Sequence, residues 1–318
     1  MGLARCKRCH VTIKQIEVYA PASIANLGPG FDVFGIALEG LGDTIILEES
    51  PEQGIRVEVK GVEAESIPLE AESNSAGAVL QHILKGRQLD YGFKLTIIKG
   101  VPPGKGMGSS GASASAAAHA ACKLLDVELS QRDYVELAAQ GEGAVSGSPH
   151  ADNISASLLG GFVIVGPSYD VLRMDPPDVE MVVVTPEVHY ENKTRLARSL
   201  LPEKVALKDA VHNIGNASRM VAAVSLNDPE LFGRCISDRL IEPHRAEMIP
   251  DFWKVKQAAL NAGAYGASIS GGGPSLLAVG PHPREIGEAM RDAFKEAGVR
   301  CDIILTGPSR LGAREVHR

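Results

Sequence analysis

Pro102-Pro103-Gly104-Lys105-Gly106-Met107-Gly108-Ser109-Ser110-Gly111 is a glycine-rich stretch of the sequence. Before it, apolar residues at alternate positions predict a strand over Gly92–Ile98. After it, an alanine-rich stretch predicts a helix over Ala112–Leu125, whose small side chains let another element pack closely. The glycines let the backbone turn tightly and approach a ligand, because no Cβ is in the way. We therefore predict a glycine-rich loop between a strand and a helix.

This loop has the chemistry of a phosphate site. Free backbone amides at the start of a helix, together with the positive end of the helix dipole, suit a bound phosphate. The hydroxyls of Ser109 and Ser110 can cap the helix, donate to phosphate or bind a magnesium ion. The segment is neither a Walker A loop nor a dinucleotide fingerprint, since the spacings differ. A purely structural turn capped by serines stays open as the alternative.

Two other segments also predict a backbone that approaches a ligand. Pro21–Asp32 places three polar groups in a small, apolar loop after the first strand. Ser268–Ser275 joins two apolar strands through three consecutive glycines, whereas an ordinary hairpin needs one or two.

The rest of the chain mixes strands and helices without regular alternation, which predicts two α+β domains. The proline-rich stretch 166–178 marks the boundary, so we expect a disordered extension over 1–12, an ATP-binding domain over 13–170 and a second domain over 171–318. We expect strands over 14–20, 44–48, 54–60, 92–98, 181–185, 266–270, 275–279 and 299–305, and helices over 74–84, 112–125, 194–201, 208–226, 229–236, 252–262 and 284–297.

Composition excludes some classes of function. The net charge of -7 disfavours non-specific nucleic-acid binding, which needs a positive surface. No apolar run approaches the roughly 20 residues that span a bilayer, so we expect no membrane partner and a cytoplasmic location. In the N-terminal extension, Cys6, Cys9 and His10 match a haem-attachment pattern, and a metal site or disulfide is a further alternative to plain disorder.

Taken together, Pro21–Asp32, the glycine-rich loop and Ser268–Ser275 resemble the three signature motifs of the GHMP kinases, in the same order. Gly147–Asn153, followed by Gly160-Gly161, is similar to a segment of the homoserine kinase family. The substrate-side segments of that family resemble Thr194–Arg198 and Ile241–Arg245. The resemblance implies a first domain like domain 2 of ribosomal protein S5 and a ferredoxin-like second domain. This sequence departs from the family pattern at Met107, Gly111 and Gly272, where Leu, Ala and Ser are usual.

The resemblance implies transfer of phosphate from ATP to the side-chain hydroxyl of L-homoserine, a step of threonine biosynthesis. It places magnesium on Ser110 and Glu142, and adenine near Asn74 and Lys99. A solvated carboxylate is the alternative for Glu142, and an ordinary surface lysine for Lys99. The loop residues implied to hold the nucleotide are Pro103, Gly104, Lys105, Gly106, Met107, Gly108, Ser109 and Ser110.

On the substrate side, Arg198 and Arg245 are candidates for the α-carboxylate, because a guanidinium matches its geometry. A salt bridge on a helix face is their alternative role. Asp32 is the candidate for the α-ammonium. The other implied substrate contacts are Asn26, His150, Asn153 and Thr194.

Asn153, Asp152 and Arg198 are the candidate catalytic residues. An amide cannot act as a general base, so Asn153 can only orient the hydroxyl or stabilise charge. Asp152 is the titratable group beside it, and ordering of the loop is its alternative role. We expect catalysis by proximity and electrostatics without a dedicated base.

Other functions remain open at this stage. They are another GHMP kinase, acting on mevalonate or shikimate, and a non-catalytic regulatory protein with the same fold. By analogy with kinases that are often dimers, the resemblance also suggests a homodimer.

Overall fold

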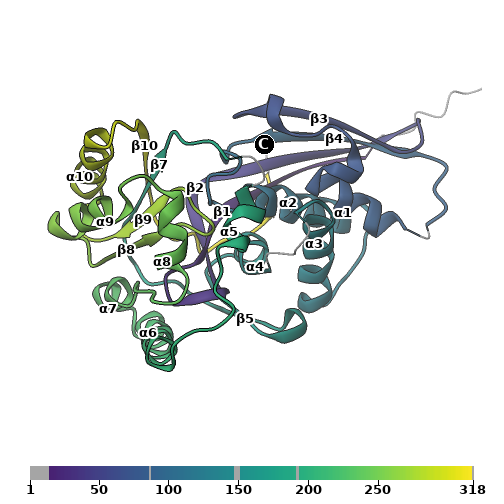
Figure 1. Cartoon of the computed structure of the whole chain (residues 1–318). Coiled ribbons are helices and arrows are strands. Elements are labelled where there is room, and N and C mark those ends of the chain that lie inside the picture. Colours follow the sequence, from purple (N-terminus) through teal and green to yellow (C-terminus); the bar gives the residue numbers. More distant parts are fainter. Residues whose placement is uncertain (1–13, 86, 147–150, 191–192, 317–318) are drawn as a thin grey trace, which may run out of the picture.

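A computed structural model describes residues 14–85, 87–146, 151–190 and 193–316 of the chain. The expected extension over 1–12, with Cys6, Cys9 and His10, lies outside the described residues. Figure 1 shows long strands with a group of helices on one side, and a second sheet with its own helices beside them. This arrangement confirms the α+β class.

The first sheet has the strand order β11-β1-β2-β4-β3, with β5 paired to β2 and β6 paired to β5. Its strands are β1 (Gln15–Asn26), β2 (Gly30–Ser50), β3 (Ile55–Gly61), β4 (Gly92–Lys99), β5 (Phe162–Val165), β6 (Val171–Met174) and β11 (Arg314–Glu315). β1 and β2 form an antiparallel hairpin, and β3 is parallel to β4 because α1 lies in the connection between them.

Helices α1 (Ser75–Leu84), α2 (Ser109–Leu124), α3 (Gln131–Ser146) and α4 (Ala151–Leu159) cover one face of this sheet. α2 lies in their midst, in contact with β1, β2, α1, α3 and α4. Its alanines are completely buried, as the composition of the stretch predicts. Short side chains let the neighbours approach closely, and this fixes the position of the helix start where the glycine-rich loop ends.

The second sheet has the order β10-β7-β9-β8 and is antiparallel throughout. Its strands are β7 (Met181–Pro186), β8 (Gly266–Ile269), β9 (Leu276–Val279) and β10 (Cys301–Thr306). The helices of this half are α5 (Lys193–Ser199), α6 (Leu207–Leu226), α7 (Pro229–Arg234), α8 (Glu242–Arg245), α9 (Phe252–Asn261) and α10 (Pro283–Glu296). α9 and α10 cover one face, and a second apolar cluster joins the other face to β1 and β2.

The structure differs from the expectation for Pro21–Asp32. β1 continues to Asn26 and β2 begins at Gly30, so most of this segment is strand rather than loop. The pairing shifts register between Pro21 and Ser23, and again between Ala25 and Asn26, which bends the hairpin toward the second sheet. Small residues and a proline look like loop in sequence, but here they form bent strands packed against other elements.

The division into 13–170 and 171–318 stays a proposal. β6 lies beyond that division yet pairs with β5, and β11, near the end of the chain, pairs with β1. Residues 13–170 and residues 171–318 therefore both contribute strands to the first sheet. In the parts of the chain that the structure describes, no helix is long and apolar enough to cross a membrane.

Candidate functional site

The three glycine-containing segments meet and hydrogen-bond to one another. The backbone amide of Ser23, in the first segment, donates to the carbonyl of Met107 in the loop at 3.1 Å. The Asn26 side chain donates to the carbonyl of Gly271 in the third segment at 2.9 Å. The Ser270 hydroxyl closes the ring by donating to the carbonyl of Gly106 at 2.9 Å. Segments as much as 245 residues apart thus form one unit.

The loop keeps its backbone amides free. None of the amides of 104–111 donates a hydrogen bond to another described residue, so they are available to an anion. Gly106 and Gly108 have φ of +83° and +65°, in the left-handed region. A Cβ on Gly106 would lie 2.2 Å from the Ser270 carbonyl oxygen, and one on Gly108 would lie 2.2 Å from the Ser23 hydroxyl. Glycine is therefore required at both positions.

A buried ion pair holds the loop from behind. Lys99, at the end of β4, pairs with Asp43 on β2, and both side chains are almost fully buried. The Lys99 ammonium also donates to the Ser109 carbonyl at 3.1 Å and to the Ser113 hydroxyl at 3.0 Å. Asp43 in turn accepts the amides of Gly100 and Val101 at 3.0 and 3.1 Å. Burial lowers the pKa of Lys99, and the Asp43 carboxylate opposes that shift.

The expectation that adenine lies near Lys99 stays a prediction, and Lys99 does line the cavity. Its three N–H donors are used by Asp43, Ser109 and Ser113, so its contribution is to fix the strand–loop–helix junction. The alternative that Lys99 is an ordinary surface lysine is wrong, because its side chain is buried.

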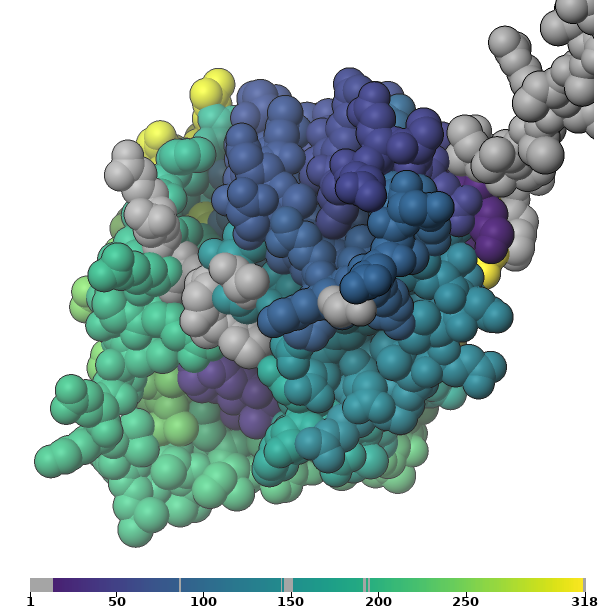
Figure 2. Space-filling model, turned by 90° about the vertical axis from the view of Figure 1, so that its right-hand side faces the viewer, coloured from purple at the N-terminus to yellow at the C-terminus, as the bar shows by residue number. Residues whose placement is uncertain are grey.

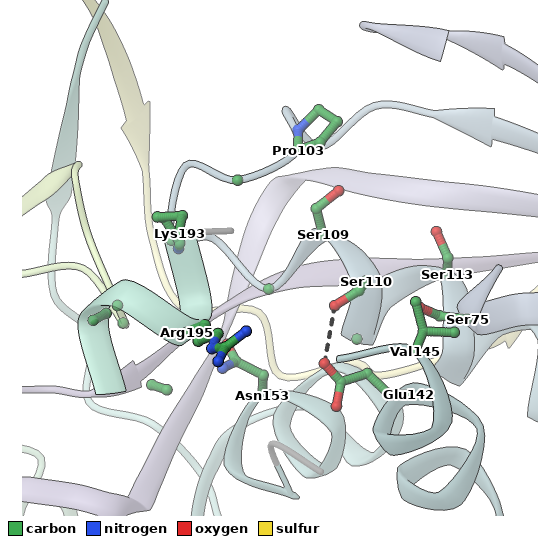
Figure 3. Close-up of a pocket in the computed structure, with 18 of the residues that line it drawn as sticks. Ser75, Pro103, Ser109, Ser110, Ser113, Glu142, Val145, Asn153, Lys193 and Arg195 are labelled. Atoms are coloured by element: carbon green, nitrogen blue, oxygen red, sulfur yellow. Dashed lines mark hydrogen bonds between the residues drawn. The ribbon is translucent and has the colours of Figure 1, made fainter. Parts of the chain in front are cut away.

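Ser110 and Glu142 face each other across the start of α2. The Ser110 hydroxyl donates to the Glu142 carboxylate at 3.2 Å, as the dashed line in Figure 3 marks. Glu142 is only 2% exposed, which rules out a solvated surface carboxylate. Both groups offer oxygen ligands, the kind that Mg²⁺ prefers.

Asn153 is held by Ser23. The Ser23 hydroxyl lies 3.0 Å from both the side-chain oxygen and the carbonyl oxygen of Asn153. The Asn153 backbone amide donates to the Asp152 carboxylate at 2.7 Å, so Asp152 does order the start of α4. The side-chain nitrogen of Asn153 donates to no other described residue. It lines the cavity and is available to a hydroxyl oxygen.

A charged cluster lies on the second-sheet side. Arg198 on α5 forms a two-pronged pair with Asp32, with N–O distances of 2.8 and 3.3 Å. Arg245 on α8 is 5% exposed and donates to the carbonyls of Ala197 and Gly271 at 3.3 and 3.2 Å. Burial lowers the pKa of Arg245, with the nearby Asp32 opposing. Phe31 lies beneath both guanidinium groups, with ring-centre distances of 5.9 and 5.1 Å.

Many of these groups line one cavity of about 590 Å³. Its wall includes Asn74, which caps α1 by accepting the amides of Ala76 and Gly77. In Figure 2, purple surface from the first strands lies between the blue-teal surface of the first half and the green surface of the second. The predicted site residues that line the cavity are Asn26, Asp32, Asn74, Lys99, Pro103, Gly104, Gly106, Gly108, Ser109, Ser110, Glu142, Asp152, Asn153, Arg198 and Arg245.

Of the remaining predicted residues, Lys105 and Met107 do not line it. The Lys105 ammonium turns toward the carbonyls of Pro186 and Val188, at 3.5 and 3.3 Å, and Met107 is fully buried in the shared core. Their backbone amides still belong to the loop. His150 lies outside the described residues. Thr194 is the second residue of α5, but its side chain also lies outside them.

Sequence reasoning missed three residues. Asp43 gave no distinct signal in the sequence, because β2 also contains Asp32, Glu39, Glu48 and Glu49. Lys193 and Arg195 line the cavity from α5, and their signal was the run of cations at 193, 195 and 198.

Comparison with known proteins gives matches over both halves. Residues 74–161 match the family model for the N-terminal domain of GHMP kinases, and residues 220–299 match that for their C-terminal domain. A homoserine kinase of Pyrococcus abyssi is 44% identical over 296 residues, covering 92% of this chain and 97% of that protein.

Solved structures agree. A homoserine kinase from Cytophaga hutchinsonii superposes with a TM-score of 0.88 at 34% identity, covering 99% of this chain and 100% of that one. Lactococcus lactis galactokinase in complex with galactose, at 14% identity and a TM-score of 0.71, shares the fold over 95% of each chain.

Proposed function

The chain belongs to the homoserine kinases within the GHMP kinases, and on that premise we propose that it transfers the γ-phosphoryl group of ATP to the side-chain hydroxyl of L-homoserine. The observation that supports this most directly is the glycine-rich loop, whose free amides line a cavity shared with an amino-acid-like set of charges. The expected two-domain GHMP fold is confirmed by the matches to both domain models. A cytoplasmic location is part of the proposal.

The nucleotide fits one end of the cavity. The amides of 104–111 point an array of donors at the triphosphate, assisted by the positive end of α2. The apolar side chains of Ile67, Pro68 and Val145 line the cavity near Asn74, and this supports binding of adenine there. Lys99 and Asp43 keep the loop in place without touching the nucleotide.

The residues present fit a magnesium ion. Ser110 and Glu142 supply two adjacent oxygen ligands, and no cluster of three or more His, Cys, Asp or Glu exists among the described residues. Mg²⁺ typically takes one or two protein oxygens and completes its shell with phosphates and water, so a two-residue site suits it. When bound, the ion neutralises phosphate charge.

The charges of the second half match an amino acid. Homoserine carries one α-carboxylate and one α-ammonium, and the site offers guanidinium groups from Arg198 and Arg245 and a carboxylate from Asp32. The Asp32–Arg198 pair has the same two charges as the substrate. We propose that the substrate carboxylate binds the two arginines, and that its ammonium binds Asp32.

Catalysis then depends on position rather than on a base. Asn153 is oriented by Ser23 and offers its side-chain N–H groups to the hydroxyl oxygen, which fixes that oxygen relative to the loop. Asp152 accepts the backbone amide of Asn153 and thereby orders the residue. Phosphoryl transfer needs little covalent chemistry from the protein, so aligned reactants and neutralised charge suffice.

The reaction is tested by coupled ADP release with L-homoserine, L-serine, mevalonate and shikimate. We expect rapid release with L-homoserine alone. Release with mevalonate or shikimate instead would identify another GHMP kinase. Absence of nucleotide binding would favour the non-catalytic alternative.

Arg198→Lys is expected to raise the KM for homoserine about 30-fold, with kcat/KM for ATP nearly unchanged. Lysine keeps the charge but loses the fork that a carboxylate binds, and one charged hydrogen bond contributes about 2 kcal/mol. Initial rates against homoserine concentration measure this. An unchanged KM would contradict the assignment of the carboxylate site.

For the homodimer, we propose that the outer face of α6 is the contact. Leu207, Val211 and Ile214 are 79%, 60% and 66% exposed, and exposed Ser218 and Ser225 continue the same face. This face carries no charge, which is unusual on a surface helix. In an antiparallel pair, the large residues of one copy would pack on the small residues of the other.

Ile214→Glu is therefore expected to convert a dimer to a monomer. Each glutamate would bury an unpaired charge near the centre of the pair, opposite a small residue of the other copy. Light scattering after gel filtration measures the mass. A dimer that survives this substitution, or a wild-type monomer, would contradict this surface.

A further inference from the structure

Lys193, at the start of α5, faces the glycine-rich loop although no motif pointed to it. Its ammonium donates to the carbonyl of Gly273 at 2.9 Å, and it lines the cavity. Gly106 packs against that same carbonyl. Figure 3 shows Lys193 and Arg195 on one side of the cavity, with Ser110 and Glu142 on the other.

The surroundings of Lys193 are short of negative charge. Among the described residues, no carboxylate lies within ion-pair distance of the Lys193 ammonium. The carboxylate of Asp32, on the same side of the cavity, is paired with Arg198. Burial, followed by the charges of Arg245 and Lys105, lowers its pKa to about 8. The other charged and titratable groups that line the cavity are Asp32, Lys99, Glu142, Asp152, Tyr190, Arg195, Arg198 and Arg245, and Lys105 acts on Lys193 from outside this lining.

Lys105, the lysine of the glycine-rich loop, is not placed to supply positive charge to a phosphate held there. The Lys105 ammonium is directed to the carbonyls of Pro186 and Val188, at the end of β7. Lys193 reaches from another helix to the place where a phosphate held by the loop would lie. An ammonium is a compact charge with three donors, well suited to phosphate oxygens.

We propose that Lys193 binds the terminal phosphates of the nucleotide and neutralises the phosphoryl group during transfer. This inference rests on the proposed function. In the transfer, the substrate hydroxyl oxygen forms a bond to the γ-phosphorus while the bond from that phosphorus to the β–γ bridging oxygen breaks. ADP leaves with the electron pair, and the hydroxyl proton passes to a phosphate oxygen or water. Lys193 and the Ser110–Glu142 site hold opposite sides of the group.

The test compares Lys193→Gln and Lys193→Arg with the wild-type enzyme, using Lys295→Gln on the exposed surface of α10 as the control. Loss of one charged donor to the transition state costs about 10²-fold in rate, so we expect that fall in kcat for Lys193→Gln. Lys193→Arg is expected to stay within about tenfold, because it keeps the charge. The control is expected to match wild type. Thermal unfolding checks that each variant folds.

The pH profile gives a readout that a structural role would not move. Wild-type kcat/KM for ATP is expected to fall above about pH 8, since the free enzyme then loses the ammonium charge. In Lys193→Arg, this fall in kcat/KM for ATP is expected to be absent. Calorimetry at pH 8 in two buffers is expected to show proton uptake on binding of an ATP analogue to wild type, but less uptake with Lys193→Arg.

The outcomes separate the two proposals. Equal kcat for Lys193→Gln and wild type, or an unchanged alkaline limb in Lys193→Arg, overturns the role of Lys193. Proton-linked nucleotide binding without homoserine phosphorylation would support the Lys193–phosphate contact while overturning the proposed substrate.

Discussion

Replacing Gly108 by alanine is expected to lower kcat/KM for ATP by at least about 10²-fold. The new Cβ would lie 2.2 Å from the Ser23 hydroxyl and 2.9 Å from the side-chain oxygen of Asn153, so both must move. Ser23 holds Asn153, which we propose orients the reacting hydroxyl, and a shift of about 1 Å at such a site costs about 10²-fold. The left-handed backbone adds strain of about 1 kcal/mol. Steady-state kinetics with ATP varied measure the loss.

Gly40→Ala is the matched control. Gly40 also has a left-handed backbone, with φ of +75°, but nothing lies within 4 Å of the Cβ it would gain. We expect a fall of about 1 kcal/mol in the free energy of unfolding and no change in kcat/KM. Similar kinetic losses in both variants would mean that backbone strain, rather than contact with Ser23 and Asn153, explains the effect.

Glu142→Gln is expected to lower kcat by about 10²-fold and to raise the magnesium concentration needed for half-maximal rate. Glutamine has the same shape and can still accept from Ser110, so the change removes the charge alone. Magnesium titrations at saturating ATP and homoserine measure both effects.

Glu136→Gln on the same helix supplies the control. Glu136 accepts from the Gln140 side chain and does not line the cavity. The Glu136→Gln variant is expected to keep wild-type rates and the wild-type magnesium dependence. If Glu142→Gln behaved in the same way, the metal assignment would be wrong.

Much of the fold follows from sequence patterns. The strand over Gly92–Lys99, the glycine-rich loop and the helix Ser109–Leu124 lie within a few residues of the expected bounds, because alternation, glycine and alanine act locally. Most of the expected site residues indeed line one cavity, since the three segments that contain them pack together.

The rest depends on contacts between distant residues. The predicted loop over Pro21–Asp32 is mostly strand because it pairs and packs with partners elsewhere in the chain. The partner of Lys99 is Asp43, 56 residues away, and the sequence around Lys99 does not indicate it. The position of Lys193 next to Gly273 spans 80 residues, and no local pattern reports such a distance.

The most direct measurement is a crystal structure with magnesium, a non-hydrolysable ATP analogue and L-homoserine. The account predicts phosphate oxygens about 3 Å from several backbone nitrogens of 104–111, with the homoserine hydroxyl beside Asn153. Phosphates bound elsewhere, or loop nitrogens bonded within the protein while the nucleotide is present, would contradict it.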